Sequence, residues 1–318
     1  MAATFSELGR VEAIRQLFEG SGYTPFGEPL HFRGGEGDSC VSASRLLLEG
    51  TDFNLVYFPL KHLGYKSVIS VTGELYSALA HPEALALTLG VSAKLDFEQI
   101  KELWSGVVFA AKEQGYKSLS LELEPSRNGL AISLAAAGNS HPAVRPSAES
   151  KDLVCVSGSL GAAYLGQQVL EHKRDELEKY KMLVGSYLKP ELSPDVVPLV
   201  ESTGIVPSYS YFVSRGLSDA VLRLNRDSGL GVKVYADKIP FEGNSFALGK
   251  ELDIDPVSAA MNGGDDFRLL FVVPIGRYEE FRKEFGSFDI IGHLARPDVG
   301  AVLVTPDGLE HPISAQGW

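Results

Sequence analysis

Apolar side chains recur at helical spacing in two long segments of the first half of the chain. In residues 5–19 they fall three or four positions apart, and Ser6 stands where a helix N-cap is expected. In residues 96–114 the same spacing continues over a longer stretch that includes Trp104. The pattern predicts an amphipathic helix in each segment.

Shorter apolar runs predict strands and a further helix around these segments. A Gly-rich turn at 33–38 separates residues 30–32 from the run at 40–48, which predicts a hairpin. A helix is expected to start at Pro59. Further strands are expected at 68–72, 85–91, 118–123 and 130–137, with a helical turn at 74–80. This mixture predicts an α+β domain that ends near residue 148.

The second half opens with a predicted strand at 152–156, a turn at 157–161 that reads Ser-Gly-Ser-Leu-Gly, and a helix over 162–179. A strand, a Gly-rich turn and a helix start can present backbone N–H groups to an anion. The same residues also suit any turn that packs a strand closely onto a helix, so both interpretations stay open. Later patterns predict helices at 195–203, 216–228, 246–252, 256–261 and 278–285, and strands at 207–213, 231–235, 269–273, 288–294 and 302–305.

The segment 261–274 joins a turn that contains Asn262 and two glycines to a short apolar strand. Asp265 and Asp266 lie where the turn enters this strand. Two adjacent carboxylates at such a place can bind a cation, accept hydrogen bonds from a polar ligand, or belong to a solvated turn. Gly, Asn and Asp are ordinary turn residues, which favours the last interpretation.

Composition narrows the class of protein. The chain has 318 residues, enough for two domains, and a net charge of −12 without a basic patch. This charge argues against a nucleic-acid or anionic-membrane partner. Cys40 and Cys155 are too few for a disulfide framework and lack zinc-binding spacing. With neither a signal-like N-terminus nor an apolar run of membrane-spanning length, we expect a cytoplasmic protein.

Several separated motifs together resemble the thiamine-monophosphate kinase family, whose superfamily includes aminoimidazole ribonucleotide synthetase and selenophosphate synthetase. The motifs lie at 48–53, 59–66, 156–161, 188–190, 262–267 and 317–318. The resemblance implies an α+β, two-domain architecture of the aminoimidazole ribonucleotide synthetase-like type, with mixed sheets flanked by helices. It also implies an N-terminal dimerisation and nucleotide-side domain at 1–148, a C-terminal domain at 149–318, and a homodimer. ATP and Mg²⁺ would lie between the domains, for transfer of the γ-phosphoryl group to thiamine monophosphate.

The family's metal carboxylates are only partly matched in this chain. The resemblance assigns metal binding to Glu28, Glu74 and Glu122, where the family has aspartates. Other acidic positions are lost, because Pro29, Arg45, Phe212 and Arg215 replace them. A phenyl ring has no ligand atom and a guanidinium repels a metal ion, so these changes degrade the metal site.

Other family positions keep a ligand-binding character. The resemblance assigns nucleotide binding to Ser44, Arg145, Ser214 and Arg215, and substrate binding to Asp52, Asp265 and Trp318. Arg268 replaces a residue that is usually acidic. No residue is assigned a catalytic role.

Three functional readings follow from the resemblance. In the first, the chain is a kinase with weak or absent activity. In the second, it is an active magnesium-dependent kinase that uses Glu28, Glu74 and Glu122. In the third, it is a non-catalytic dimer that binds a nucleotide or phosphate ligand. In the last reading, Arg45 and Arg215 stand where metal ions would stand, since a guanidinium fork suits phosphate oxygens. A small-molecule phosphate ligand and a second copy of the chain are the expected partners.

Overall fold

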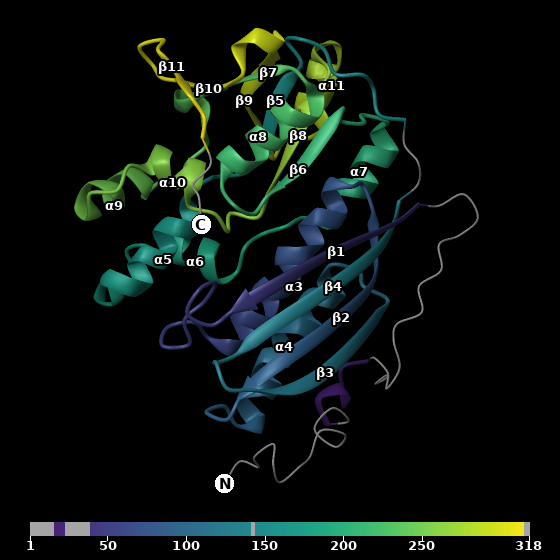
Figure 1. Ribbon diagram of the computed structural model, residues 1–318, viewed down its shortest axis with the longest axis vertical. Coiled ribbons are helices and arrows are strands. Elements are labelled where there is room, and N and C mark those ends of the chain that lie inside the picture. Colours follow the sequence, from purple (N-terminus) through teal and green to yellow (C-terminus); the bar gives the residue numbers. More distant parts are fainter. Residues whose placement is uncertain (1–15, 23–38, 141–143, 315–318) are drawn as a thin grey trace. The chain divides into compact units, whose positions relative to one another are not determined.

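The computed structural model in Figure 1 describes residues 16–22, 39–140 and 144–314. The chain divides into two compact units, residues 1–142 and 143–318. The expected division at residue 148 falls in the extended segment that opens the second unit. Of the predicted helix at 5–19, only residues 16–19 lie in the described part, and residues 16–18 are helical. The hairpin strand expected at 30–32 lies outside it.

The first unit contains a four-stranded sheet in the order β1-β4-β2-β3. Strand β4 pairs antiparallel with β1 and β2, and β2 pairs parallel with β3. Two helices cover one face of the sheet (Figure 1). The elements are β1 (Ser39–Leu48), α3 (Leu60–Ser77), β2 (His81–Ser92), α4 (Phe97–Glu113), β3 (Ser118–Ser126) and β4 (Ala131–Ser140).

Helix α3 corrects one prediction, because the strand expected at 68–72 is part of this helix. The run is rich in β-branched residues, which favours a strand by propensity. Its apolar side chains are fully buried, so the helix lacks the polar face that would have revealed its period. The Thr72 hydroxyl donates to the Val68 carbonyl one turn earlier, at 2.8 Å.

Helices α3 and α4 cross with their backbones in close contact at two glycines. A Cβ atom on Gly64 would lie 2.0 Å from the Leu103 carbonyl oxygen, and one on Gly106 would lie 1.9 Å from the Lys61 carbonyl oxygen. Asp96 and Gln99 form a reciprocal capping box at the start of α4. The helix predicted at 96–114 is therefore confirmed with its cap.

The second unit is built on a mixed seven-stranded sheet in the order β11-β10-β7-β9-β5-β8-β6. Strands β5, β6, β7 and β10 run in one direction, and β8, β9 and β11 run in the other. The strands are β5 (Leu153–Ser157), β6 (Tyr209–Val213), β7 (Gly231–Tyr235), β8 (Arg268–Val273), β9 (Phe288–Ala295), β10 (Ala301–Val304) and β11 (Glu310–Pro312). The mixed sheets with helices confirm the α+β class.

Seven α-helices connect these strands: α5 (Ala162–His172), α6 (Lys181–Leu188), α7 (Val196–Thr203), α8 (Leu217–Ser228), α9 (Ser245–Leu252), α10 (Pro256–Asn262) and α11 (Tyr278–Glu284). Short 3₁₀ turns lie at Arg174–Glu176, Ala236–Lys238, Ile275–Arg277 and Pro297–Val299. Helix α8 packs on a core cluster of this unit, which gathers apolar side chains of β5, β6, β7, β8 and β9. No helix among the described residues is long and apolar enough to cross a membrane.

The helix predicted over 162–179 is shorter than expected. It ends at His172, and after a 3₁₀ turn the chain folds back as α6. The two helices approach closely, because a Cβ atom on Gly166 would lie 2.0 Å from the Leu183 carbonyl oxygen. Tyr180 and Leu183 then pack on the apolar face of α5, so burial ends the helix where periodicity alone would have continued it.

Candidate functional site

Three loops of the second unit meet at one edge of its sheet. Strands β5 and β6 both end there, on either side of the start of β8. Val213 pairs with Arg268, and the Leu269 N–H donates to the Ser157 hydroxyl at 2.9 Å. The loops are 157–161, 214–216 and 263–267. In open sheets the carboxyl ends of parallel strands are where ligands bind, which makes this edge the candidate site.

Glycines allow these loops to pack backbone against backbone. Gly161 and Gly216 have φ values of +74° and +87°, which favour glycine. A Cβ atom on Gly161 would lie 2.8 Å from the Ala260 nitrogen, and one on Gly216 would lie 2.5 Å from the Met261 carbonyl oxygen. The loop positions are therefore fixed by contacts that side chains would prevent.

Asp266 occupies the N-terminus of helix α5. Its buried carboxylate accepts the N–H of Gly161 at 2.8 Å and the N–H of Ala163 at 3.2 Å. Burial raises the pKa of Asp266 to about 7, although these two hydrogen bonds and the charge of Arg268 act in the opposite direction. The helix start that resembled a phosphate cradle thus binds an internal carboxylate, and Asp266 is neither a solvated turn residue nor exposed to a ligand.

Three sequence-predicted site residues lie together beside this cap. The Asp265 N–H donates to the Ser214 carbonyl at 3.0 Å, which joins the loop before β8 to the loop after β6. Asp265 has a φ of +60°, a conformation that Asp tolerates better than most residues. Arg215 is exposed next to the buried Ser214. We name Ser214, Arg215 and Asp265 the loop cluster.

Arg145 does not join the loop cluster. Its guanidinium donates to the Pro207 carbonyl at 3.0 Å, before β6 begins, whereas Ser214 follows the end of that strand. Five strand residues separate the two ends by about 16 Å. Burial lowers the pKa of Arg145.

Phe212 is a core residue. Its ring is fully buried and stacks on Phe267 with centroids 5.5 Å apart and an interplanar angle of 13°. Its carbonyl oxygen accepts a hydrogen bond from Arg223 at 3.0 Å. The side chain contributes packing under the loop cluster and offers no ligand atom.

The predicted site residues of the first unit lie on different faces of its sheet. The register places Ser44 and Glu122 on the face opposite the helices, on the two edge strands, which lie roughly 14 Å apart. Arg45 alternates with Ser44 and belongs to the helix-covered face. Glu74 lies on α3, which covers that second face.

The described residues do not fit a magnesium cage. Glu74 and Glu122 belong to opposite sides of the sheet, and Glu28 lies outside the described residues. Over residues 16–22, 39–140 and 144–314, no group of three or more His, Cys, Asp or Glu side chains could hold a metal ion. Mg²⁺ needs several oxygen ligands at fixed octahedral positions, so this donor set is inadequate.

Asp52 has a structural contact in the first unit. Its carboxylate accepts the Leu48 N–H at 2.8 Å, and its own N–H donates to the Leu48 carbonyl at 2.9 Å. These bonds close the turn that follows β1. Trp318, predicted with Asp52 as a substrate contact, lies outside the described residues.

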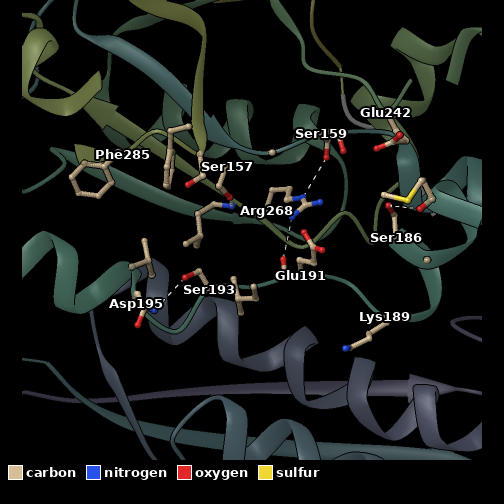
Figure 2. Close-up of a pocket in the computed structure, with 18 of the residues that line it drawn as sticks. Ser157, Ser159, Ser186, Lys189, Glu191, Ser193, Asp195, Glu242, Arg268 and Phe285 are labelled. Carbon is tan, nitrogen blue, oxygen red and sulfur yellow. Dashed lines mark hydrogen bonds between the residues drawn. The ribbon is translucent and has the colours of Figure 1, made fainter. Parts of the chain in front are cut away.

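A pocket of about 590 Å³ lies beside the same sheet edge. Figure 2 shows Arg268 near its centre, close to Ser159 and Glu191. Ser157, Lys189 and Arg268 belong to or adjoin separate sequence motifs, but the sequence did not place them in one pocket. Lys181, Ser186 and Ser193 were missed, because only folding brings the segment 181–199 against 157–159.

Comparison with known proteins relates the chain to one group of enzymes, although no family model matches it. It is 22% identical to the thiamine-monophosphate kinase of Aquifex aeolicus over 277 residues, covering 86% of this chain and 88% of that protein. It is 25% identical to the thiamine-monophosphate kinase of Pyrococcus horikoshii over 311 residues, covering 96% and 94%. The chain is therefore similar to thiamine-monophosphate kinases over most of its length.

Solved structures agree on the fold. The thiamine-monophosphate kinase from Aquifex aeolicus superposes with a TM-score of 0.74 at 22% identity, covering 87% of this chain and 90% of that chain. AaThiL complexed with AMPPCP and TMP gives the same score at 21% identity, covering 96% and 98%. The hydrogenase maturation protein HypE of E. coli gives 0.72 at 18% identity, covering 96% and 97%. These likenesses establish the aminoimidazole ribonucleotide synthetase-like fold.

The end of β6 and the loop after it differ from what the resemblance implies. The resemblance places metal carboxylates at positions 212 and 215, where this chain has a buried ring and an exposed guanidinium. The surrounding loops have close glycine contacts.

Proposed function

We propose that this relative of the thiamine-monophosphate kinases binds a nucleotide or another phosphate ligand and has weak or absent kinase activity. The observation that carries the proposal is made at the end of β6 and in the loop after it, where Phe212 is packed in the core and Arg215 is exposed. Transfer of a γ-phosphoryl group between two polyanions requires several cations held in place. A chain without the carboxylates to hold those cations is expected to bind its ligand without transferring phosphate.

The loop cluster supports an arginine-based mode of binding. Arg215 lies beside the backbone of Gly264 and Asp265, at the edge where two helices begin. A guanidinium can pair directly with phosphate oxygens in two parallel hydrogen bonds. In the proposed mode this side chain takes the place of a metal ion, and Ser214 keeps the nucleotide role that the resemblance assigns.

The metal dependence of ATP binding tests this proposal. We expect calorimetry to give similar ATP affinity in excess EDTA and in excess Mg²⁺, within about threefold, because the cation is part of the protein. Arg215→Gln is expected to weaken ATP binding about tenfold, which is the loss of one charge-assisted contact. ATP binding that requires Mg²⁺, together with formation of thiamine diphosphate, would favour the active-kinase reading instead.

We also propose that the first unit forms a homodimer through the sheet face that α3 and α4 leave open. Within the described part of this unit, no element covers that face. It carries Leu46 and Leu48, which are 54% and 40% exposed, beside small residues such as Ala135 and Ala86. A sheet face with exposed leucines and small side chains is suited to pack against a second sheet.

The oligomeric state tests the dimer directly. Sedimentation of the wild-type chain at micromolar concentration is expected to give a dimer, and Leu46→Glu is expected to give a monomer. Val56→Glu is the matched control, because Val56 is 72% exposed and lies outside the sheet. A monomeric wild type would contradict this part of the proposal.

A further inference from the structure

We propose that the second unit carries a further binding site, for a phosphate monoester with an apolar or aromatic group, in the pocket around Arg268 (Figure 2). The volume of about 590 Å³ is in the range of small-molecule sites. The lining contains no member of the loop cluster, although it shares the turn at 157–159 with the candidate site.

The guanidinium of Arg268 is held in place by backbone carbonyls. Its Nε donates to the Ser159 carbonyl at 3.3 Å, and one terminal nitrogen donates to the Glu191 carbonyl at 3.2 Å. Among the described residues it forms no ion pair with a carboxylate. The side chain is thus oriented, and apart from an electrostatic interaction with the buried Asp266, its charge and remaining N–H donors stay available to an anion.

The turn at 157–159 is shaped around this guanidinium. Gly158 has a φ of +77°, and a Cβ atom there would lie 3.1 Å from the Arg268 Cζ. Glycine therefore lets the turn pack onto the arginine.

Hydroxyl groups add donors at the same end of the pocket. The Ser157 Oγ accepts the Leu269 N–H at 2.9 Å, which leaves its own O–H to donate. Ser159 also lines the pocket and is half-buried. A phosphate group, with three terminal oxygens, matches a guanidinium flanked by two hydroxyls.

The carboxylates that line the pocket do not cancel this preference. Glu191 and Asp195 are exposed, so water screens their charges more than that of the half-buried Arg268. The Glu242 carboxylate accepts the Gly243 N–H at 3.0 Å and lies on the opposite side of the view from Phe285. Lys181 and Lys189 add positive charge to the lining.

An apolar wall explains why the ligand should be more than a free phosphate. The buried ring of Phe285 belongs to an aromatic cluster, with ring centroids 4.7 Å from Phe281 and 5.9 Å from Phe288. Leu192, Val196 and Leu199 continue the apolar lining. Burying an apolar group against this wall adds affinity that inorganic phosphate cannot gain.

Calorimetry on the full chain with phenyl phosphate tests the site. Inorganic phosphate and phenol serve as partial probes, because each carries one half of the proposed recognition. We expect phenyl phosphate to bind more tightly than either probe. Absence of binding by the wild type, or phenol that binds as tightly as phenyl phosphate, would overturn the proposal.

Variants assign the binding to this pocket. Arg268→Gln is expected to weaken phenyl phosphate binding about tenfold or more, and Arg268→Lys to weaken it less. Arg296→Gln is the matched control, since Arg296 is an exposed arginine paired with Asp298 and lies outside the pocket. Equal losses in Arg268→Gln and Arg296→Gln would overturn the proposal.

Two further variants test the assignment in chains that keep Arg268. If Arg268→Gln unfolds, Gly158→Ala, which moves the turn against the guanidinium, is expected to weaken phenyl phosphate binding in a chain that keeps its arginine. Arg215→Gln reports on binding at the loop cluster, the other proposed phosphate site. Loss of phenyl phosphate binding in Arg215→Gln but not in Arg268→Gln would place the ligand at the loop cluster and contradict the inference.

Discussion

Two strand-turn-helix connections flank β8 in the same orientation, and they differ in what faces each helix start. At the β5–α5 connection, Asp266 caps the helix from inside the protein. At the β6–α8 connection, Gly216 begins the helix without a side-chain cap, and Arg215 is exposed. The same strand-turn-helix arrangement therefore has its helix start capped by a buried carboxylate in the first case. In the second case the helix start has no side-chain cap and lies beside an exposed arginine, which is available to a ligand. A Gly-rich turn before a helix does not identify a phosphate site without its surroundings.

The largest expected effect comes from Phe212→Asp, which introduces at the end of β6 the carboxylate that the resemblance implies. Phe212→Asp removes a fully buried ring and places a carboxylate in the core beside Phe267. We expect a loss of at least about 3–5 kcal/mol in the free energy of unfolding of the second unit.

Hydrogen exchange of the β6 and β8 amides measures this loss separately from the first unit. Phe212→Leu is the control, with an expected loss of about 1.5 kcal/mol or less. Unchanged protection in Phe212→Asp would show that position 212 can still hold a carboxylate, and would weaken the case against a metal site.

The next effect concerns the cap at the β5–α5 connection. Asp266→Ala leaves the N–H groups of Gly161 and Ala163 without their acceptor, which is expected to lower stability by about 1–3 kcal/mol. Asp265→Asn, at the adjacent and partly exposed carboxylate, is expected to change stability by about 0.5 kcal/mol or less. Denaturant unfolding of both variants makes the comparison, and equal effects would contradict the capping role.

The pH dependence of stability sharpens the same point. Because burial raises the pKa of Asp266 to about 7, above its unfolded value, the folded state holds this proton more tightly than the unfolded state. The contribution of Asp266 is complete below its unfolded pKa and is lost as pH rises through about 7. Asp266→Asn is expected to remove this component. Identical pH profiles between about pH 4 and 8 in the two proteins would contradict it.

The smallest expected effect on stability is at Arg215. Because the side chain is exposed, Arg215→Gln is expected to change the free energy of unfolding by about 0.5 kcal/mol or less, while it weakens ATP binding. Thermal unfolding and calorimetry of the same sample separate the two effects. A large loss of stability would assign Arg215 a structural role like that of Asp266.

Sequence patterns predicted the elements whose signals are local. Helix α4 has one apolar face and a capping box at Asp96, so its position followed from spacing. The run at 68–72 was misread, because a helix buried on all sides has no polar face. Strand β11, three exposed residues long, carried no hydrophobic signal and was missed.

The candidate site was less predictable, since its contacts join distant segments. The pair of carboxylates at 265–266 was visible in the sequence, but the bond from Asp266 to Gly161 spans 105 positions. Alternation along β3 separates Glu122 from the buried side chains on the other face of the sheet. Only the position of α3, which carries Glu74, shows that the two carboxylates lie on opposite sides of the sheet. The pocket around Arg268 depends on the return of α6 onto α5, which no local pattern indicated.

The most direct test of the central claim is an assay of thiamine diphosphate formation by the unmodified chain. The reaction contains ATP, thiamine monophosphate and Mg²⁺, with the thiamine-monophosphate kinase of Aquifex aeolicus as the positive control. We expect turnover at least about a hundredfold slower than the control, because the described residues contain no group of three or more His, Cys, Asp or Glu side chains that could hold the cations. Magnesium-dependent turnover at a rate similar to the control would contradict the account.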